Sequence, residues 1–435
     1  MKRSKTAIFA MALGVLAVAS GIGLYCAVGS SASQPAGKPI IIGAPLSTQY
    51  LYGWAAQRGM VLAVEEINAR GGVLVGGVRR PLALEVLDTR DLEPGVPLSE
   101  ALLVVERLIL EKKAAALVGG PVRSEAALAA MDLIAKHKKI SILTTGALTP
   151  AYHRRVAENY EKYKYLFRIT SEAGQLAKEA IDLLDSLRQA DGFDRIFIMV
   201  QDVAHARAIG GLVAKGLEPK GWKVLGNEVY PTGALDYSTG LLKAKDQGAQ
   251  ILFVWMDHPE TAILVKQWHD LKIPVLPVSG ISGLVEQPGA WASSSGAVAY
   301  WVASPANAGN APSNATPLTM KFYQAYTKRW LVEPEGYGAS SSYVGIQVLA
   351  RAIERAGSPD ADRLAAALEK TDVTSAYGRI RFDPKSHQVI PSYDPKEGAV
   401  GTWFQWQQGK RVAVWPPTIA TGKIRVPPWL EPKKG

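Results

Sequence analysis

Residues that could bind a small polar molecule follow the ends of apolar, strand-like runs. Arg123 lies in the loop Gly119-Gly-Pro-Val-Arg-Ser124 after the apolar run Ala115–Val118, and its guanidinium could bind a carboxylate bidentately. Ser124 could add its hydroxyl, and backbone N–H groups at the start of the following helix favour an anion. The alternative roles are a solvated surface arginine and a serine that only caps the helix.

Acidic and imidazole groups follow two later apolar runs. Asp202 and His205 come after Arg195–Val200, and Asp257 comes after Ile251–Trp255. A desolvated ligand ammonium needs a charged or multiply hydrogen-bonded partner, which Asp257 or Asp202 could supply. The alternatives are a helix cap for Asp257 and a surface or capping position for the lone His205.

Motifs of catalysis and of cofactor binding are missing from the sequence after the N-terminal segment. It holds no G-x-G-x-x-G, and the phosphate-loop candidate Gly211–Gly216 continues with Leu217 instead of Lys-Ser/Thr. Gly280-Ile-Ser-Gly283 lacks the G-x-S-x-G spacing, and none of the six histidines has metal-site spacing. We therefore predict a protein that is not an enzyme and needs no cofactor or metal.

The elements that must position these residues alternate between strand and helix. Near-continuously apolar strands in such an alternation predict an α/β fold with parallel sheets covered on both faces. We expect strands at Pro39–Ala44, Leu82–Leu87, Ala115–Val118, Ile140–Thr144, Arg195–Val200, Lys223–Val229, Ile251–Trp255, Val275–Val278 and Ala297–Ala303. We expect helices at Trp54–Ala69, Pro97–Glu111, Ser124–Lys136, Glu172–Ser186, Ala206–Pro219, Tyr237–Gln247, His258–Leu271, Pro317–Trp330, Ser340–Arg355 and Ala361–Lys370.

The alternation occurs twice, which predicts two doubly wound lobes. Pro39–Ile142 holds four strands and Arg195–Val278 holds four more. The tyrosine-rich stretch Thr149–Thr170 between them is interpreted as the crossing from one lobe to the other. Short strands at Gly378–Phe382 and Thr402–Gln407 and a Pro-rich tail end the chain.

Composition and charge narrow the class of partner. The 435 residues are 48% hydrophobic and 20% charged, enough for sizeable cores, and the formal net charge is +10. A nucleic-acid-binding protein would gather its basic residues in one stripe, whereas here they are scattered. We expect no nucleic-acid partner and, at most, a bias toward anionic small molecules.

The first 32 residues are predicted to be an export signal or an N-terminal anchor. Lys2, Arg3 and Lys5 precede the uncharged, mostly apolar stretch 6–29, and small residues follow. This stretch is long for a cleaved signal, so an uncleaved membrane anchor is the alternative. Cys26, the only cysteine, follows Tyr25 and has Gly23 three positions before it, which favours removal over lipidation. We expect a periplasmic or otherwise extracytoplasmic location.

The sequence also resembles a known family, the type I periplasmic binding proteins of the branched-chain amino acid (Leu/Ile/Val-binding) class of ABC importers. The resemblance covers residues 38–415. It rests on Ile42-Gly-Ala-Pro-Leu-Ser, Ala63-Val-Glu-Glu-Ile-Asn-Ala-Arg-Gly-Gly, Leu117-Val-Gly-Gly-Pro with Ser124, Thr144-Thr-Gly-Ala-Leu-Thr-Pro, and Phe404-Gln-Trp with Gly409-Lys.

The resemblance implies two lobes joined by three crossing segments, with a ligand in the cleft between lobes that close by hinge bending. The first lobe would comprise 38–168 plus 301–400, the second 169–300 plus 401–415, and a tail 416–435. The ligand would be an amino acid, amide or organic acid, and the partner an ABC permease in the cytoplasmic membrane. The protein would act as a monomer; a ligand-sensing module of the same fold is the alternative.

The resemblance further implies site residues. Tyr52 falls where the family places an aromatic over the ligand, and Thr145, Gly146 and Ala147 fall in the loop that meets the ligand's amino and carboxyl groups. Two positions depart from the family, because Leu148 replaces a ligand-binding threonine and Ser279 stands where amino acid binders carry a glutamate. These changes weaken the case for an ordinary amino acid ligand.

Overall fold

The computed structural model describes residues 37–430. The predictions for the export segment and Cys26 lie outside these residues. Among the helices of residues 37–430, none combines the length and apolar character that crossing a membrane requires.

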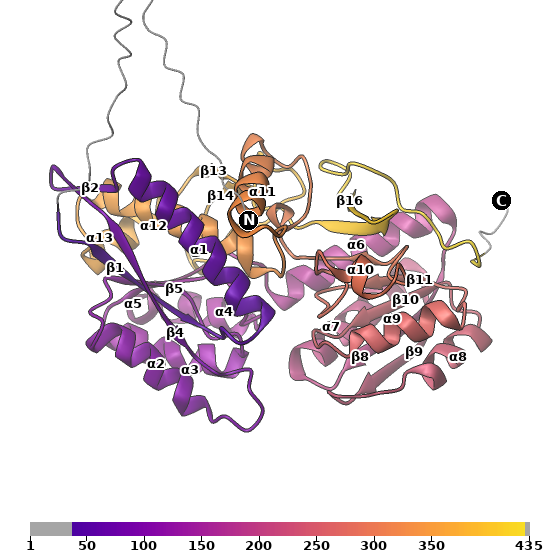
Figure 1. Ribbon diagram of the computed structural model, residues 1–435. Coiled ribbons are helices and arrows are strands. Elements are labelled where there is room, and N and C mark those ends of the chain that lie inside the picture. Colours follow the sequence, from indigo (N-terminus) through magenta and orange to yellow (C-terminus); the bar gives the residue numbers. More distant parts are fainter. Residues whose placement is uncertain (1–36, 431–435) are drawn as a thin grey trace, which may run out of the picture. The chain divides into compact units, whose positions relative to one another are not determined.

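Five parallel strands form the first sheet, in the order β4-β1-β5-β6-β7 (Figure 1). They are β1 (Ile40–Leu46), β4 (Leu82–Asp88), β5 (Ala116–Gly119), β6 (Ile140–Leu143) and β7 (Leu166–Arg168). Every residue of β5, β6 and β7 is buried. Burial on both faces explains why these strands are near-continuously apolar rather than alternating.

Helices cover both faces of the first sheet (Figure 1). One face carries α1 (Leu51–Ala69), α12 (Gly338–Ala356) and α13 (Ala361–Glu369), with α11 (Pro317–Trp330) against α1. The other carries α2 (Leu98–Leu110), α3 (Ser124–Lys136), α4 (Ala151–Glu158) and α5 (Tyr160–Tyr163). The two faces hold separate hydrophobic clusters, one around Ile42 and Ile346 and one around Val105 and Met131.

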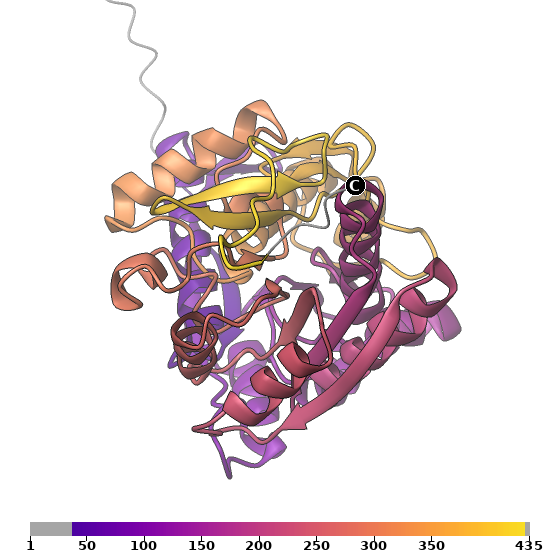
Figure 2. The same ribbon diagram turned by 90° about the vertical axis from the view of Figure 1, so that its right-hand side faces the viewer.

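Seven strands form the second sheet, in the order β16-β15-β12-β11-β10-β8-β9. They are β8 (Arg195–Gln201), β9 (Lys223–Tyr230), β10 (Ile251–Trp255), β11 (Leu276–Ser279), β12 (Val302–Ala303), β15 (Trp403–Gln407) and β16 (Lys410–Trp415). The strands from β9 to β12 are parallel, whereas β15 and β16 are antiparallel and lie at one edge (Figure 2). The faces carry α6 (Ala173–Asp191) with α7 (Ala204–Leu217) and α8 (Ser238–Asp246) with α9 (Thr261–Asp270).

Short elements complete the fold. They are the hairpin β2 (Val73–Val75) and β3 (Val78–Arg80), the pair β13 (Val373–Ser375) and β14 (Gly378–Ile380), helix α10 (Ala290–Ser293), and the 3-10 turns η1 (Glu218–Lys220) and η2 (Ala308–Asn310).

The chain passes between the two sheets three times: after β7, after β12 and before β15. The interpretation of all of Thr149–Thr170 as a crossing was wrong. Its apolar side chains, including Tyr152, Val156 and Tyr163, are buried in the cluster on the first sheet, and β7 pairs with β6. The crossing begins only after Arg168. The residue bounds of the two lobes remain a prediction.

Two further expectations were wrong. Helix α1 begins at Leu51 and not at Trp54, so Tyr52 lies on its first turn rather than in a loop. The expected strand Ala297–Ala303 shrinks to Val302–Ala303, because Tyr300 takes a φ of 70° and the chain turns there while Val298 and Trp301 stay buried.

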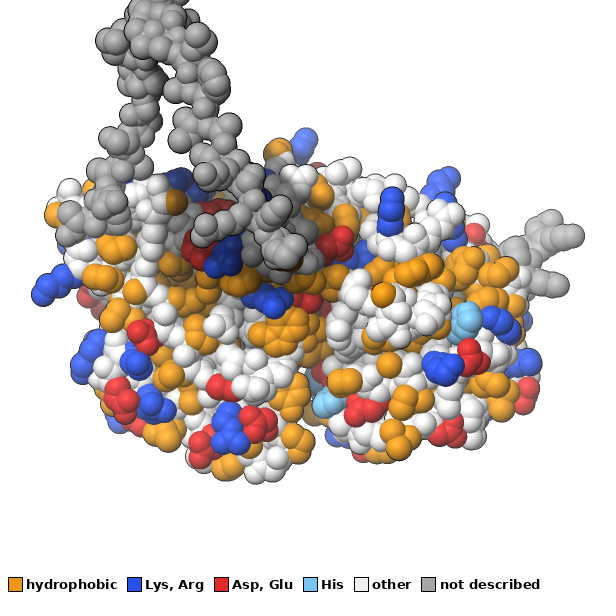
Figure 3. Space-filling model, in the orientation of Figure 1, with side chains coloured by type: hydrophobic (Ala, Val, Ile, Leu, Met, Phe, Trp, Pro, Cys, Tyr) orange, Lys and Arg blue, Asp and Glu red, His pale blue; other side chains and the backbone are white. Residues whose placement is uncertain are grey.

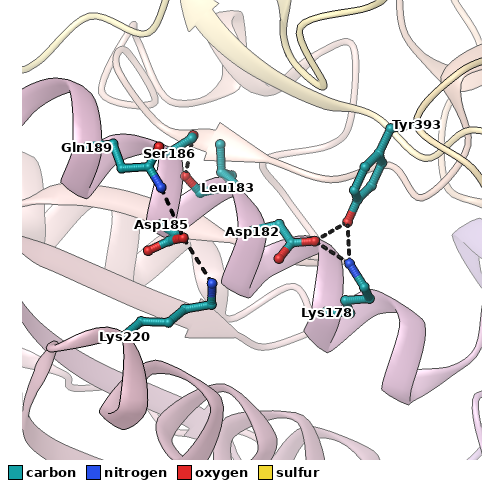
Figure 4. A network of polar contacts seen from close by, with 8 residues as sticks. All are labelled: Lys178, Asp182, Leu183, Asp185, Ser186, Gln189, Lys220 and Tyr393. Atoms are coloured by element: carbon teal, nitrogen blue, oxygen red, sulfur yellow. Dashed lines mark hydrogen bonds and ion pairs between the residues drawn. The ribbon is translucent and has the colours of Figure 1, made fainter.

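Charged surface residues are well mixed. Figure 3 shows positive and negative side chains interspersed over one face instead of gathered by sign. On α6, Asp182 accepts hydrogen bonds from Lys178 at 2.5 Å and from Tyr393 at 2.6 Å, and Asp185 pairs with Lys220 at 2.9 Å (Figure 4). Tyr393 precedes β15, so this network fastens the last crossing segment to α6.

Candidate ligand-binding cleft

A cavity of about 680 Å³ lies between the two sheets. Its walls come from the segments that follow β1, β4, β5 and β6 of the first sheet and β8, β9, β10 and β11 of the second. The carboxyl ends of strands in open parallel sheets are where such folds bind ligands, and the volume suits a small molecule. The predicted residues Tyr52, Arg123, Ser124, Asp202, His205 and Asp257 line this cavity.

Tyr52 connects the two sides of the cavity. It is 6% exposed, and its hydroxyl donates to the backbone carbonyl oxygen of Asp257 at 3.0 Å. Its ring lies 4.7 Å from that of Tyr337, centroid to centroid. Burial, followed by the nearby carboxyl groups of Glu286 and Asp257, raises the pKa of Tyr52 well above its ordinary value, so its hydroxyl stays protonated and can donate.

Arg123 is the N-cap residue of α3, and its side chain makes few contacts with the rest of the protein. Its backbone N–H donates to the Asp91 carboxylate at 2.7 Å, which fixes the loop, while its Nε lies 3.9 Å from Glu125 Oε2. Asp91 is 2% exposed and also accepts from Ser47 and from Thr89. The guanidinium is therefore held by only one long, exposed contact and is available to an anion.

Ser124 is the first residue of α3 rather than its N-cap, a position that Arg123 occupies. The Ser124 hydroxyl accepts from the backbone N–H of Thr149 at 3.3 Å. It therefore ties together the loops that follow β5 and β6, in addition to facing the cavity.

Thr145, Gly146 and Ala147 are near the cavity but do not line it, whereas Leu148 does. Thr145 and Ala147 are fully buried. Gly146 has a φ of 68°, and a Cβ there would lie 2.2 Å from Val122 Cα. The loop is held from behind by Arg168, a buried side chain that donates to the carbonyl oxygens of Ala147 at 2.6 Å and Thr149 at 3.0 Å.

His205 and Asp257 form a pair on the second-sheet side, with 2.9 Å between Nε2 and Oδ2. Asp257 does not cap α9, because that helix begins at Thr261 with Glu260 as its N-cap. Burial alone would raise the pKa of Asp257, but the hydrogen bond and charge of His205 lower it below its ordinary value. Asp202 pairs with Arg207, so this wall carries charges of both signs.

Ser279 and Glu286 lie behind the lining. Ser279 is fully buried at the end of β11, and its hydroxyl donates to the Val302 carbonyl at 3.4 Å. Glu286 is also fully buried. Its carboxyl faces Tyr52 and Asp257, and burial followed by the charge of Asp257 raises its pKa well above the ordinary value. Arg411 donates to the Glu286 backbone carbonyl at 3.1 Å.

Sequence reasoning missed several lining residues. The loop Asp91–Gly95 lines the cavity and follows β4. Arg123 was selected because it follows the end of a strand, and the same criterion applies to this loop. Trp255 ends β10, and Ile281 comes two residues after β11. Tyr337 precedes α12, far along the chain, and no local signal placed it here.

The arrangement can bind and enclose a small molecule. Aromatic and aliphatic side chains (Tyr52, Tyr337, Trp255, Leu148 and Ile281) offer an apolar wall, and Arg123 with the His205–Asp257 pair offers polar partners. Among residues 37–430, no group of three or more His, Cys, Asp or Glu side chains is placed to hold a metal ion.

Two helix-covered sheets, three crossings and a cavity between the sheets define a two-lobed ligand-binding protein. The family described as periplasmic binding proteins matches residues 44–394. The chain therefore belongs to this family and is a substrate-binding protein of the ABC transporter type.

Individual relatives agree with this assignment. A Leu/Ile/Val-binding protein homologue of Brucella melitensis is 24% identical over 381 residues, which cover 86% of this chain and 89% of the relative. Among solved structures, a branched-chain amino acid ABC transporter protein from Silicibacter pomeroyi covers 90% of this chain and 100% of its own, at 19% identity and a TM-score of 0.77.

Two solved structures of the same fold hold different ligands. The substrate-binding protein of a branched-chain amino acid transporter from Streptococcus pneumoniae, in complex with isoleucine, is 20% identical, covers 87% of this chain and 100% of its own, and has a TM-score of 0.68. A solute-binding protein from R. palustris, in complex with benzoate, is 16% identical, covers 90% and 99%, and has a TM-score of 0.68. The fold alone does not select the ligand.

Proposed function

We propose that this protein is the extracytoplasmic solute-binding component of an ABC importer that captures a small carboxylate with an apolar body. One observation carries the proposal: a cavity of about 680 Å³ whose walls come from the strand ends of both sheets. A ligand held by both walls favours the closed arrangement of the lobes, which a permease partner could then recognise.

The charges around the cavity support a carboxylate. Arg123 has only a 3.9 Å contact with Glu125, so a ligand carboxylate can take its bidentate donors. Asp257 is already paired with His205, so its carboxylate is not an unpaired partner for a ligand ammonium group. Isoleucine and benzoate, bound by the two proteins of the same fold, share a carboxylate and an apolar body.

A panel of matched pairs tests this proposal. Benzoate and isoleucine are compared with benzamide and isoleucinamide by thermal unfolding, because a ligand that binds the native state raises the melting temperature. We expect shifts with carboxylates and none with amides. Arg123→Ala should weaken carboxylate binding about 10-fold to 100-fold, as loss of a charged hydrogen bond does.

Arg363→Gln is the control, since Arg363 is exposed on α13 away from the cavity. Equal binding of amides and carboxylates would contradict the carboxylate assignment. The absence of a shift with all four compounds and with a broader set of amino acids and organic acids would contradict the cleft as a binding site.

A further inference from the structure

A second cavity, of about 430 Å³, lies at the C-terminal end of α1. Its walls come from the end of α1, the β2–β3 hairpin and the C-terminal half of α12, and Figure 1 shows these elements side by side. Tyr52 and Arg70 are 18 residues apart along α1, or roughly 27 Å at 1.5 Å per residue. This cavity is therefore separate from the cleft.

Three arginines from three different elements meet in this cavity: Arg70 at the end of α1, Arg79 in β3 and Arg351 in α12. Gln347 adds an amide, and Glu354 is the one carboxylate of the lining. Three guanidinium groups against one carboxylate leave a positive cavity. Positive side chains that line the same cavity repel each other unless an anion binds between them.

The existing partners leave most of these donors free. Arg351 has no hydrogen bond or ion pair among residues 37–430. Arg70 is 63% exposed and reaches Glu66 only at 3.8 Å. Arg79 uses Nη1 for the Gly72 carbonyl at 3.2 Å, and Glu354 accepts from the backbone N–H of Leu74 at 3.2 Å.

The C-terminal end of a helix ordinarily repels anions, but the carbonyl groups at this end of α1 already accept hydrogen bonds. The Ile67 carbonyl accepts from Arg70 and Gly72, the Asn68 carbonyl accepts from Gly71, and the Gly72 carbonyl accepts from Arg79. Capping reduces the negative field of the helix end, so the guanidinium groups decide the sign of the site.

We propose that this cavity binds a phosphate group. A phosphate offers three terminal oxygens and about two negative charges, which match three guanidinium forks better than a carboxylate does. Ile67, Val73 and Ala350 give the cavity an apolar floor for the organic part of a phosphate ester.

A phosphate ester could come from solution or from a phospholipid headgroup. The first described residues lie on the same hairpin, because the Gly37 N–H donates to the Arg79 carbonyl at 3.1 Å and Arg80 donates to the Lys38 carbonyl at 2.7 Å. The uncharged stretch 6–29 ends eight residues before Gly37, a span of at most about 29 Å. Lipid phosphates would therefore be within reach of this cavity if that stretch remained in a membrane.

The experiment uses the full-length protein and two kinds of probe. Thermal unfolding is followed with inorganic phosphate or pyrophosphate, against acetate at equal ionic strength. Co-sedimentation is measured with vesicles of phosphatidylglycerol in phosphatidylcholine, against phosphatidylcholine alone. Arg351→Gln and Arg70→Gln are the test variants, and Arg363→Gln removes one exposed charge from the same half of the protein as a control.

We expect phosphate to raise the melting temperature more than acetate does, and Arg351→Gln to weaken that binding about tenfold. A response to soluble phosphate identifies a soluble ester, and a response only to phosphatidylglycerol identifies a lipid headgroup. No response to either probe, a rise in melting temperature with acetate as large as that with phosphate, or the same loss in Arg363→Gln overturns the proposal. Cleft binding should be unchanged in Arg351→Gln, which separates this test from that of the proposed function.

Discussion

The hydroxyl of Tyr52, on the first turn of α1, donates a hydrogen bond of 3.0 Å to the backbone carbonyl of Asp257, which follows β10. This bond joins the two sides of the cleft directly. The side chain of Asp257 meanwhile holds His205. Asp257 therefore contacts the opposite side of the cleft through its backbone and lines the cavity with its side chain.

Tyr52→Phe should weaken ligand binding about threefold to tenfold, because it removes one neutral hydrogen bond across the cleft and keeps the ring against Tyr337. Isothermal titration with a cleft ligand measures the loss. Tyr50→Phe is the matched control, since Tyr50 also lines the cavity. An equal loss in both variants, or none in Tyr52→Phe, would contradict a bridging role.

Arg168→Lys should lower the free energy of unfolding by about 3 kcal/mol, since it leaves buried carbonyl groups without their donors. Arg168 also donates to Gln388 at 2.6 Å, and burial lowers its pKa to about 10, so it stays charged at neutral pH. Urea unfolding measures the loss, and hydrogen exchange should become faster at Ala147–Thr149. Arg154→Gln, an exposed change on α4, should alter neither the free energy of unfolding nor the hydrogen exchange. Equal effects in the two variants would refute the role of Arg168 in holding this loop.

Much of the fold could be predicted from the sequence, because buried parallel strands are continuously apolar and amphipathic helices repeat their apolar residues at helical spacing. Ser124–Lys136 and Pro317–Trp330 match the observed helices at both ends. One failure came where an apolar run is buried on both sides of a turn, since Val298 and Trp301 are buried while the chain turns at Tyr300. At the start of α1, Gly53 suggests a loop, yet it is a helical residue whose missing Cβ allows Ser47 to approach.

The candidate site was predictable only where it follows a strand. Arg123, His205 and Asp257 were found by that rule and line the cavity. The sequence could not indicate that Asp257 pairs with His205, nor that Glu286 and Arg411 meet behind Tyr52, because packing between distant segments creates those contacts.

Gly146→Ala should destabilise the protein more than a positive φ alone explains. A Cβ at Gly146 would lie 2.2 Å from Val122 Cα, whereas Gly192, with a similar φ of 71°, has nothing within 4 Å. We expect Gly192→Ala to lower the free energy of unfolding by about 1 kcal/mol. Gly146→Ala should lose about 1–3 kcal/mol more through overpacking. Equal losses in urea unfolding would show that the two loops can move apart.

Glu179 predicts a pH dependence of stability. It lies on α6, fully buried against the last crossing segment, where a Cβ on Gly401 would come within 2.4 Å of its carboxylate. Burial raises the pKa of Glu179 from 4.5 to about 8. Below pH 4.5 the carboxyl is protonated in both the folded and the unfolded chain, so it adds no pH dependence there.

Between pH 4.5 and 8 the folded chain keeps a proton that the unfolded chain releases. The free energy of unfolding should therefore fall as the pH rises, by a total on the order of 3 kcal/mol at pH 7. Glu179→Gln stays neutral, so its stability relative to the natural protein should be similar at pH 5 and increasingly higher up to pH 8. Urea unfolding from pH 5 to 9 measures this difference. The exposed change Glu218→Gln should give the same dependence of unfolding free energy on pH as the natural protein. If Glu179→Gln also gave that same dependence, a protonated Glu179 would be refuted.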